Sequence, residues 1–202
     1  MVSKPSGSAS SPVYLPREDF DLVKIVVVGP FGIGKTTAVG AVSEIGTLHT
    51  EEPMTQAAEA LDDLVVDGKT TTTVALDFGR ITLHAARIVL YLFGTPGQER
   101  FKVLWDDITE GALGALVLVD TRRLAASFEV MDLVEKAGLD YVVALNQFPD
   151  TPAHDLGLVR SKLDLEAHTP LVTCDARDRT SVLGALRTLT DHLISRAGAQ
   201  PS

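Results

Sequence analysis

Residues 29–36 read GPFGIGKT and follow directly on the apolar run LVKIVVV at residues 22–28. The run is short and rich in β-branched residues, which predicts a buried strand. We expect the next element, over residues 35–45, to be a helix that stops at Gly46. The eight residues match the pattern G-x-x-x-x-G-K-[ST] in the strand-loop-helix context that this motif requires. The sequence therefore predicts a phosphate-binding loop, here called the P-loop.

The residue types of the P-loop suit phosphate chemistry. Glycines allow successive backbone N–H groups to turn inward around phosphate oxygens, and the helix N-terminus adds its positive end. We expect Lys35 to reach the β- and γ-phosphates of a nucleotide and the Thr36 hydroxyl to ligate Mg²⁺. The motif predicts nucleotide binding, but it does not by itself separate kinases, ATPases and GTPases.

Apolar runs of strand length alternate with helix-length segments along the chain, which is typical of a mostly parallel sheet covered on both faces. Further strands are expected at residues 72–83, 87–93, 113–120, 141–145 and 171–174, and further helices at residues 98–110, 124–137, 154–163 and 181–196. The strands 72–83 and 87–93 are predicted to form an antiparallel hairpin at one edge. Residues 47–71 are expected to be a long connection, in which residues 56–64 could form a short helix. The expected fold class is α/β, a three-layer α/β/α sandwich of the P-loop NTPase type, with a mostly parallel sheet and one antiparallel edge strand.

Length and composition favour one such domain. The chain has 202 residues, of which 45% are hydrophobic, and this suits a single α/β core. We expect the domain at residues 20–196, with a Ser- and Pro-rich N-terminal tail at residues 1–19 and a C-terminal tail at residues 197–202. The formal net charge of −9 disfavours non-specific binding to nucleic acid or to an anionic membrane. No apolar run is long enough for direct membrane insertion, and no signal peptide is evident. We therefore expect a cytoplasmic protein that reaches a membrane only through a partner.

Four further segments carry a resemblance. Residues 93–101, FGTPGQERF, resemble the D-x-x-G-Q-E switch II segment of Ras-like GTPases, and residues 73–78, TVALDF, resemble the switch I stretch T-I-G-V-D-F. Residues 146–150, NQFPD, stand where the base-reading N-K-x-D would be, and residues 174–177, CDAR, resemble the last base-contact loop. The chain thus resembles the Ras superfamily over nearly the whole predicted domain. Its sequence in these segments is most similar to that of the actinobacterial conservon GTPases, relatives of the Mgl-type polarity GTPases.

The resemblance implies a switch that binds GTP and GDP with Mg²⁺ and hydrolyses GTP slowly. The Gly97 amide would bind the γ-phosphate, and Lys35 would contact the phosphates during catalysis. Gln98 would orient the attacking water, and Thr73 would bind the metal together with Thr36. The run of threonines at residues 70–73 leaves the switch I assignment open by about a residue. The residues expected to bind the nucleotide are Gly29, Pro30, Phe31, Gly32, Ile33, Gly34, Lys35, Thr36, Thr37, Gly97, Asn146, Gln147, Asp150, Asp175, Ala176 and Arg177. A roadblock-type regulator and a sensor-kinase-like protein are the partners that the resemblance implies.

Two departures from the Ras pattern bear on this reading. Gly94 stands where an Asp would hold a water on Mg²⁺, and Asp77 on the neighbouring strand either replaces that carboxylate or points away. In the base-reading loop Gln147 replaces the Lys, and Asp150 comes one residue late. Asp150 either reaches guanine through a bulged loop or belongs to a turn. Guanine preference is thus expected but open.

Two alternatives remain beside the GTPase switch. One is a nucleotide-dependent scaffold with little or no hydrolysis, which Gly94 favours. The other is a P-loop NTPase or kinase that uses ATP, which fits the P-loop but lacks an Arg-rich lid. Four arginines could stabilise charge in a transition state from within the chain, but the sequence assigns none of them this role; they are Arg80, Arg100, Arg122 and Arg123.

Overall fold

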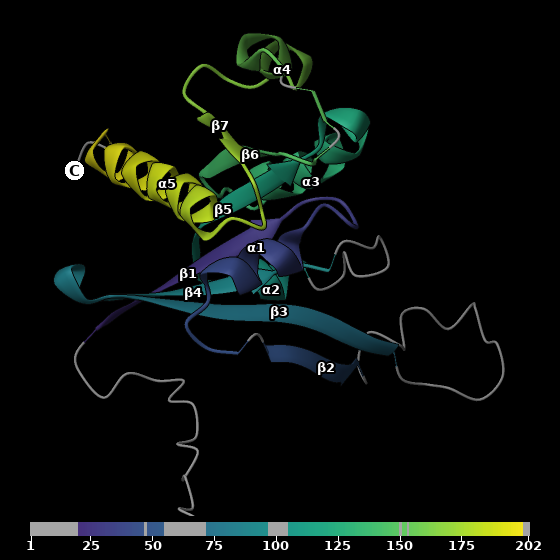
Figure 1. Ribbon diagram of the computed structural model, residues 1–202. Coiled ribbons are helices and arrows are strands. Elements are labelled where there is room, and N and C mark those ends of the chain that lie inside the picture. Colours follow the sequence, from purple (N-terminus) through teal and green to yellow (C-terminus); the bar gives the residue numbers. More distant parts are fainter. Residues whose placement is uncertain are drawn as a thin grey trace, which may run out of the picture.

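The structure is a computed structural model, which describes residues 20–46, 48–54, 72–96, 105–149, 151–152 and 154–199. These residues form one sheet with helices on both sides (Figure 1). Among them, no helix is long and apolar enough to cross a membrane.

The sheet in the described part of the chain has seven strands in the order β2-β3-β4-β1-β5-β6-β7. Their bounds are β1 Asp21–Val28, β2 Leu48–Met54, β3 Thr72–Leu83, β4 Ile88–Gly94, β5 Ala112–Val119, β6 Tyr141–Asn146 and β7 Leu171–Cys174. The strands from β4 to β7 pair in parallel. Strand β3 runs antiparallel to both of its neighbours, β2 and β4. The predicted α/β class and mostly parallel sheet are confirmed.

The predicted position of the antiparallel strand is wrong in one respect. Strand β3 is not the edge of the sheet, because β2 pairs with it from Leu48 opposite Phe78 to Met54 opposite Thr72. The sequence of β2, LHTEEPM, contains two glutamates and a proline, which are depleted in strands, so residues 48–54 carried no strand signal and were assigned to a connection. A proline is tolerated in an outermost strand. The helix considered at residues 56–64 lies outside the described residues.

Five α-helices and two 3₁₀ turns are described. They are α1 Lys35–Val42, α2 Trp105–Thr109, α3 Ala125–Lys136, α4 Leu156–Lys162, α5 Arg179–Ala199, η2 His84–Ala86 and η4 Thr121–Arg123. Helix α1 ends three residues earlier than expected, and α5 continues to Ala199, into the segment that the sequence assigned to a tail. For α2, the predicted residues 98–104 lie outside the description.

The alternation of side chains along β1 builds two cores. Ile25 and Val27 pack with α1 and α5 on one face of the sheet, whereas Val26 and Val28 pack with residues of α2, α3 and α4 on the other. Successive strand residues point to opposite faces, so a continuous apolar run is what a strand covered on both sides requires. This arrangement is the predicted three-layer sandwich. The carboxyl ends of the parallel strands meet along one edge of the sheet, where parallel α/β proteins bind their ligands.

Candidate functional site

The P-loop joins β1 to α1 in a conformation that only glycine adopts easily. Gly29 has φ +148°, and a Cβ added there would lie 2.6 Å from the carbonyl oxygen of Leu118. Gly34, the N-cap of α1, has φ +104°, and a Cβ there would approach the Asn146 amide nitrogen to 3.1 Å. The loop therefore lies against β5 and β6 without side chains of its own at these two positions, which leaves its backbone amides close to whatever it binds.

Lys35 is held inside the curve of the P-loop. Its side chain is 7% exposed, and its Nζ donates hydrogen bonds to the carbonyl oxygens of Gly29 at 2.7 Å and Pro30 at 2.9 Å. Burial lowers the pKa of Lys35 from 10.5 to about 8, although the charge of Asp77 raises it in part. An ammonium group so poorly solvated is stabilised by an incoming anion, so this position suits a phosphate group.

The hydroxyl of Thr36 donates a hydrogen bond to Oδ2 of Asp77. Asp77 is 8% exposed and lies on β3 directly opposite Gly94 of β4. A Cβ added to Gly94 would lie 2.9 Å from the Asp77 Cβ and 3.0 Å from its Oδ2. The Asp77 carboxylate thus faces the P-loop across the space above Gly94, and of the two orientations left open by the sequence it adopts the one toward the site.

The donors around Thr36 fit a magnesium ion. The part of the chain that the structure describes contains no group of three or more His, Cys, Asp or Glu side chains that could hold a metal on their own. Magnesium in nucleotide sites is usually held by one or two protein oxygens together with phosphates and waters. The Thr36 hydroxyl and the Asp77 carboxylate are two such oxygens in contact with each other at the start of α1.

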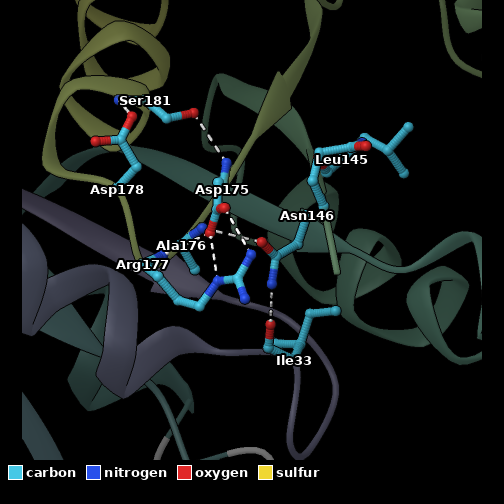
Figure 2. A network of polar contacts seen from close by, with 9 residues as sticks. Ile33, Leu145, Asn146, Asp175, Ala176, Arg177, Asp178 and Ser181 are labelled. Carbon is cyan, nitrogen blue, oxygen red and sulfur yellow. Dashed lines mark hydrogen bonds and ion pairs between the residues drawn. The ribbon is translucent and has the colours of Figure 1, made fainter. Parts of the chain in front are cut away.

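Asn146 joins the P-loop to the loop that follows β7 (Figure 2). Its side chain is 3% exposed; its Nδ2 donates to the Ile33 carbonyl oxygen at 2.7 Å, and its Oδ1 accepts from the Ala176 backbone N–H at 3.0 Å. Both hydrogen-bonding ends of one buried amide are therefore used to fix two loops. The strand end that carries Asn146 becomes the common support of both.

The loop after β7 is stiffened by its own charges. Arg177 donates from Nε and Nη2 to the two oxygens of Asp175, at 2.8 and 2.7 Å. These hydrogen bonds, together with one from the Arg177 backbone, hold the pKa of Asp175 at about 2. The Asp175 backbone N–H donates to the Ser181 hydroxyl at 2.8 Å, so the loop is tied to the first turn of α5 (Figure 2).

A second charged pair lies beside the loop that follows β6. Asp120, at the end of β5 and 2% exposed, accepts hydrogen bonds from the Arg122 backbone and guanidinium. The Arg122 guanidinium carbon lies 3.9 Å from the ring centroid of Phe148. Burial would raise the pKa of Asp120, but the hydrogen bonds and charge of Arg122, with the charge of Arg123, outweigh it and lower that pKa.

This Asp120–Arg122–Phe148 cluster was not found from the sequence. Gln147, which stands in the place of a lysine, donates its backbone N–H to the Cys174 carbonyl at 2.7 Å. Its side-chain Nε2 donates to the Leu145 carbonyl at 3.4 Å and brings no positive charge to the loop. Arg122 supplies a cation there instead. The available signal was an acidic residue at a strand end followed two residues later by arginine.

Other sequence-predicted site residues differ in how far the structure describes them. Thr37 lies exposed in the first turn of α1. Thr73 lies in β3 opposite Pro53 of β2, and nothing further is described of its side chain. Gly97, Gln98 and Asp150 lie outside the described residues, so their roles stay predictions.

Comparisons with known proteins support nucleotide binding by this chain. A family model described as conserved hypothetical ATP binding protein matches residues 27–156, which include the P-loop, Asp77 and Asn146. An uncharacterised protein of Methanocaldococcus jannaschii is 30% identical over 130 residues, covering 63% of this chain and 71% of that protein. The Ras-related protein RABA3 of Arabidopsis thaliana is 31% identical over 110 residues, covering 54% of this chain and 39% of that protein. The Ras-related protein RabG2 of Dictyostelium discoideum is 25% identical over 166 residues, or 82% of this chain and 71% of that protein.

Proposed function

Since the chain belongs to the family of conserved hypothetical ATP-binding proteins and has Ras-related relatives, we propose that this P-loop nucleotide-binding protein is a Ras-like switch. It binds GTP and hydrolyses it slowly to GDP and phosphate. The observation that carries the proposal is the double hydrogen bond of Asn146 to Ile33 and Ala176. Through it, the phosphate-binding loop and the two loops expected to contact the base form one continuous site.

The proposed reaction is an in-line attack of water on the γ-phosphate. Lys35 stabilises negative charge that develops on the phosphate oxygens, the Gly97 amide binds the γ-phosphate, and Gln98 places the water. Mg²⁺ bound beside Thr36 would neutralise charge on the β- and γ-phosphates. Contacts of the γ-phosphate with Thr73 and residues 97–100 would order those segments, and hydrolysis would release them. Such switches commonly depend on a partner for about 10³ to 10⁵ of their rate, which is why we propose slow intrinsic turnover.

We propose that Asp77 supplies the carboxylate that Gly94 cannot provide in the switch II segment. The support is its hydrogen bond with Thr36 and its position over Gly94. In this assignment Asp77 and Thr36 would hold Mg²⁺ and its waters, and Thr73 would be the further protein ligand. Because a carboxylate is available from β3, the glycine at position 94 does not by itself favour a scaffold without hydrolysis.

The choice of base is the point at which two functions compete. The description of the matching family names ATP, which favours an ATP-using P-loop NTPase as the second candidate, whereas the Ras-related relatives favour guanine. Calorimetric titration of nucleotide-free protein with GTP, GDP and ATP, each with and without Mg²⁺, separates the two. Much tighter binding of the guanine nucleotides supports the switch, and equal binding of ATP reduces the proposal to an unspecified P-loop NTPase.

A scaffold that binds nucleotide without hydrolysing it is tested at Gln98. If the Gln98→Leu variant hydrolyses GTP as fast as the parent protein, Gln98 is not catalytic and the result supports the scaffold hypothesis. The cellular setting of the switch, in bacterial signalling with a roadblock-type partner and a sensor-kinase-like protein, rests on the resemblance to the conservon GTPases. Co-purification of the GTP-bound protein with such a partner, and its absence with the GDP-bound form, would support it.

A further inference from the structure

Arg123 contacts the P-loop from a neighbouring strand end. It is the last residue of η4, the turn that follows β5, and its Nη2 donates to the backbone carbonyl oxygen of Phe31 at 3.3 Å. Strand β5 pairs directly with β1, with Val28 opposite Val117, so the turn after β5 begins beside the loop after β1. The contact therefore follows from the sheet order.

The other arginines considered from the sequence have different surroundings. Arg80 forms an ion pair with Glu44 at 3.7 Å, and Arg122 is paired with Asp120 and stacked on Phe148. Arg100 lies outside the described residues. Arg123 is distinct because its guanidinium lies against the middle of the P-loop and donates to the carbonyl of Phe31. This carbonyl follows those of Gly29 and Pro30 in the chain. Those two carbonyls hold Lys35.

We infer that Arg123 is an intrinsic transition-state residue, which contributes its guanidinium to the γ-phosphate during hydrolysis. The inference rests on the proposed function. A guanidinium has five N–H donors in a planar fork, and the contact with Phe31 uses one of them. Arg123 is exposed, and its guanidinium already lies at the P-loop, so a rotation of the side chain would bring its remaining donors over the loop.

The chemical step is unchanged by this assignment. The water oxygen forms a bond to the γ-phosphorus, the bond from that phosphorus to the β–γ bridging oxygen breaks with its electron pair going to GDP, and both protons of the water leave with the phosphate. Arg123 keeps its own protons and donates hydrogen bonds to oxygens on which charge accumulates. Because that charge is greatest in the transition state, Arg123 accelerates hydrolysis more than it strengthens binding.

The test compares the parent protein with Arg123→Ala, Arg123→Lys and a control, Arg187→Ala, on the exposed face of α5. Single-turnover hydrolysis of GTP, calorimetric affinities for GTP and GDP, and retention of GDP with aluminium fluoride are measured for each, after thermal unfolding confirms a folded variant. We expect Arg123→Ala to hydrolyse about 10²-fold more slowly and to lose retention of GDP with aluminium fluoride, while both nucleotide affinities change little. Arg123→Lys, which keeps the charge but not the fork, should be intermediate, and Arg187→Ala should match the parent.

The outcomes separate this inference from the function on which it rests. Equal hydrolysis by Arg123→Ala and an active parent overturns the inference alone, as does an equal loss of rate and affinity, which would make Arg123 only a structural support of the loop. A parent that binds guanine nucleotides but neither hydrolyses GTP nor retains aluminium fluoride overturns both the inference and the proposed hydrolysis. A parent that binds no guanine nucleotide overturns the proposed function itself.

Discussion

The hydroxyl of Thr36, in the first turn of α1, is hydrogen-bonded to the carboxylate of Asp77 on β3. Asp77 faces Gly94 so closely that a side chain at position 94 would collide with it. The two positions therefore constrain each other: the glycine on β4 provides the space that the aspartate on β3 occupies. A carboxylate thus lies beside the P-loop threonine although position 94 has no side chain, and it comes from β3, the antiparallel neighbour of β4.

Replacement of Asp77 by Ala should weaken Mg²⁺-dependent nucleotide binding. The variant removes the carboxylate that contacts Thr36, and loss of a group that orients a metal ligand typically costs about 10- to 100-fold in metal affinity. We expect that loss in GTP affinity in the presence of Mg²⁺ and little change in EDTA, both measured by calorimetry. Asp132→Ala, an exposed carboxylate on α3, is the matched control. Equal losses with and without Mg²⁺ would contradict the assignment.

A carboxylate placed at position 94 on β4 should serve the site only if Asp77 is removed. Gly94→Asp in the parent places a Cβ 2.9 Å from that of Asp77 beside a like charge, and we expect overpacking to lower the free energy of unfolding by about 1–3 kcal/mol. The double variant Asp77→Gly/Gly94→Asp should regain stability and Mg²⁺-dependent binding relative to Asp77→Gly. Urea unfolding and calorimetry measure the two effects. A double variant no better than Asp77→Gly would show that position 94 cannot serve the metal.

The parts of the molecule with strong local signals were predicted from the sequence. The P-loop combines a motif with its required context, and β3 and β7 have the predicted bounds because their apolar runs end at clear breaks. Strand β2 was missed because LHTEEPM has no strand signal without its partner β3. A pairing partner distant in the sequence decided its structure.

The orientation of single side chains could not be predicted from the sequence for the same reason. Asp77 faces the site because β3 pairs with β4 in a register that puts it opposite Gly94. A shift of one residue would reverse its face. Likewise, the stacking of Arg122 on Phe148 depends on two loops from different strands lying together, whereas its pairing with Asp120 is local. Such a contact between loops depends on the order of the strands in the sheet, which local sequence patterns do not indicate.

Nucleotide binding above pH 8 should be accompanied by proton uptake at Lys35. Burial lowers the pKa of this group to about 8 in the free protein, whereas bound phosphates favour the charged form and raise it. Above about pH 8 the bound protein therefore holds more protons than the free protein, so affinity falls as pH rises, by up to about tenfold per pH unit. Calorimetry of GDP binding at pH 9, in two buffers with different ionisation enthalpies, measures the uptake. Lys35→Arg stays charged and should abolish it; equal uptake by that variant would assign the proton elsewhere.

Removal of the Asn146 amide should loosen the site and destabilise the fold together. In Asn146→Ala the buried Ile33 carbonyl and Ala176 N–H lose their partner, and unsatisfied buried groups cost about 1–3 kcal/mol each. We expect a corresponding drop in the free energy of unfolding by urea and a weaker affinity for GDP. Asn146→Asp still offers an acceptor to Ala176 but has no donor for Ile33, so it should not restore binding. If Asn146→Ala were as stable as the parent and bound GDP equally well, the amide would not be the joint between the phosphate-binding and base-side loops.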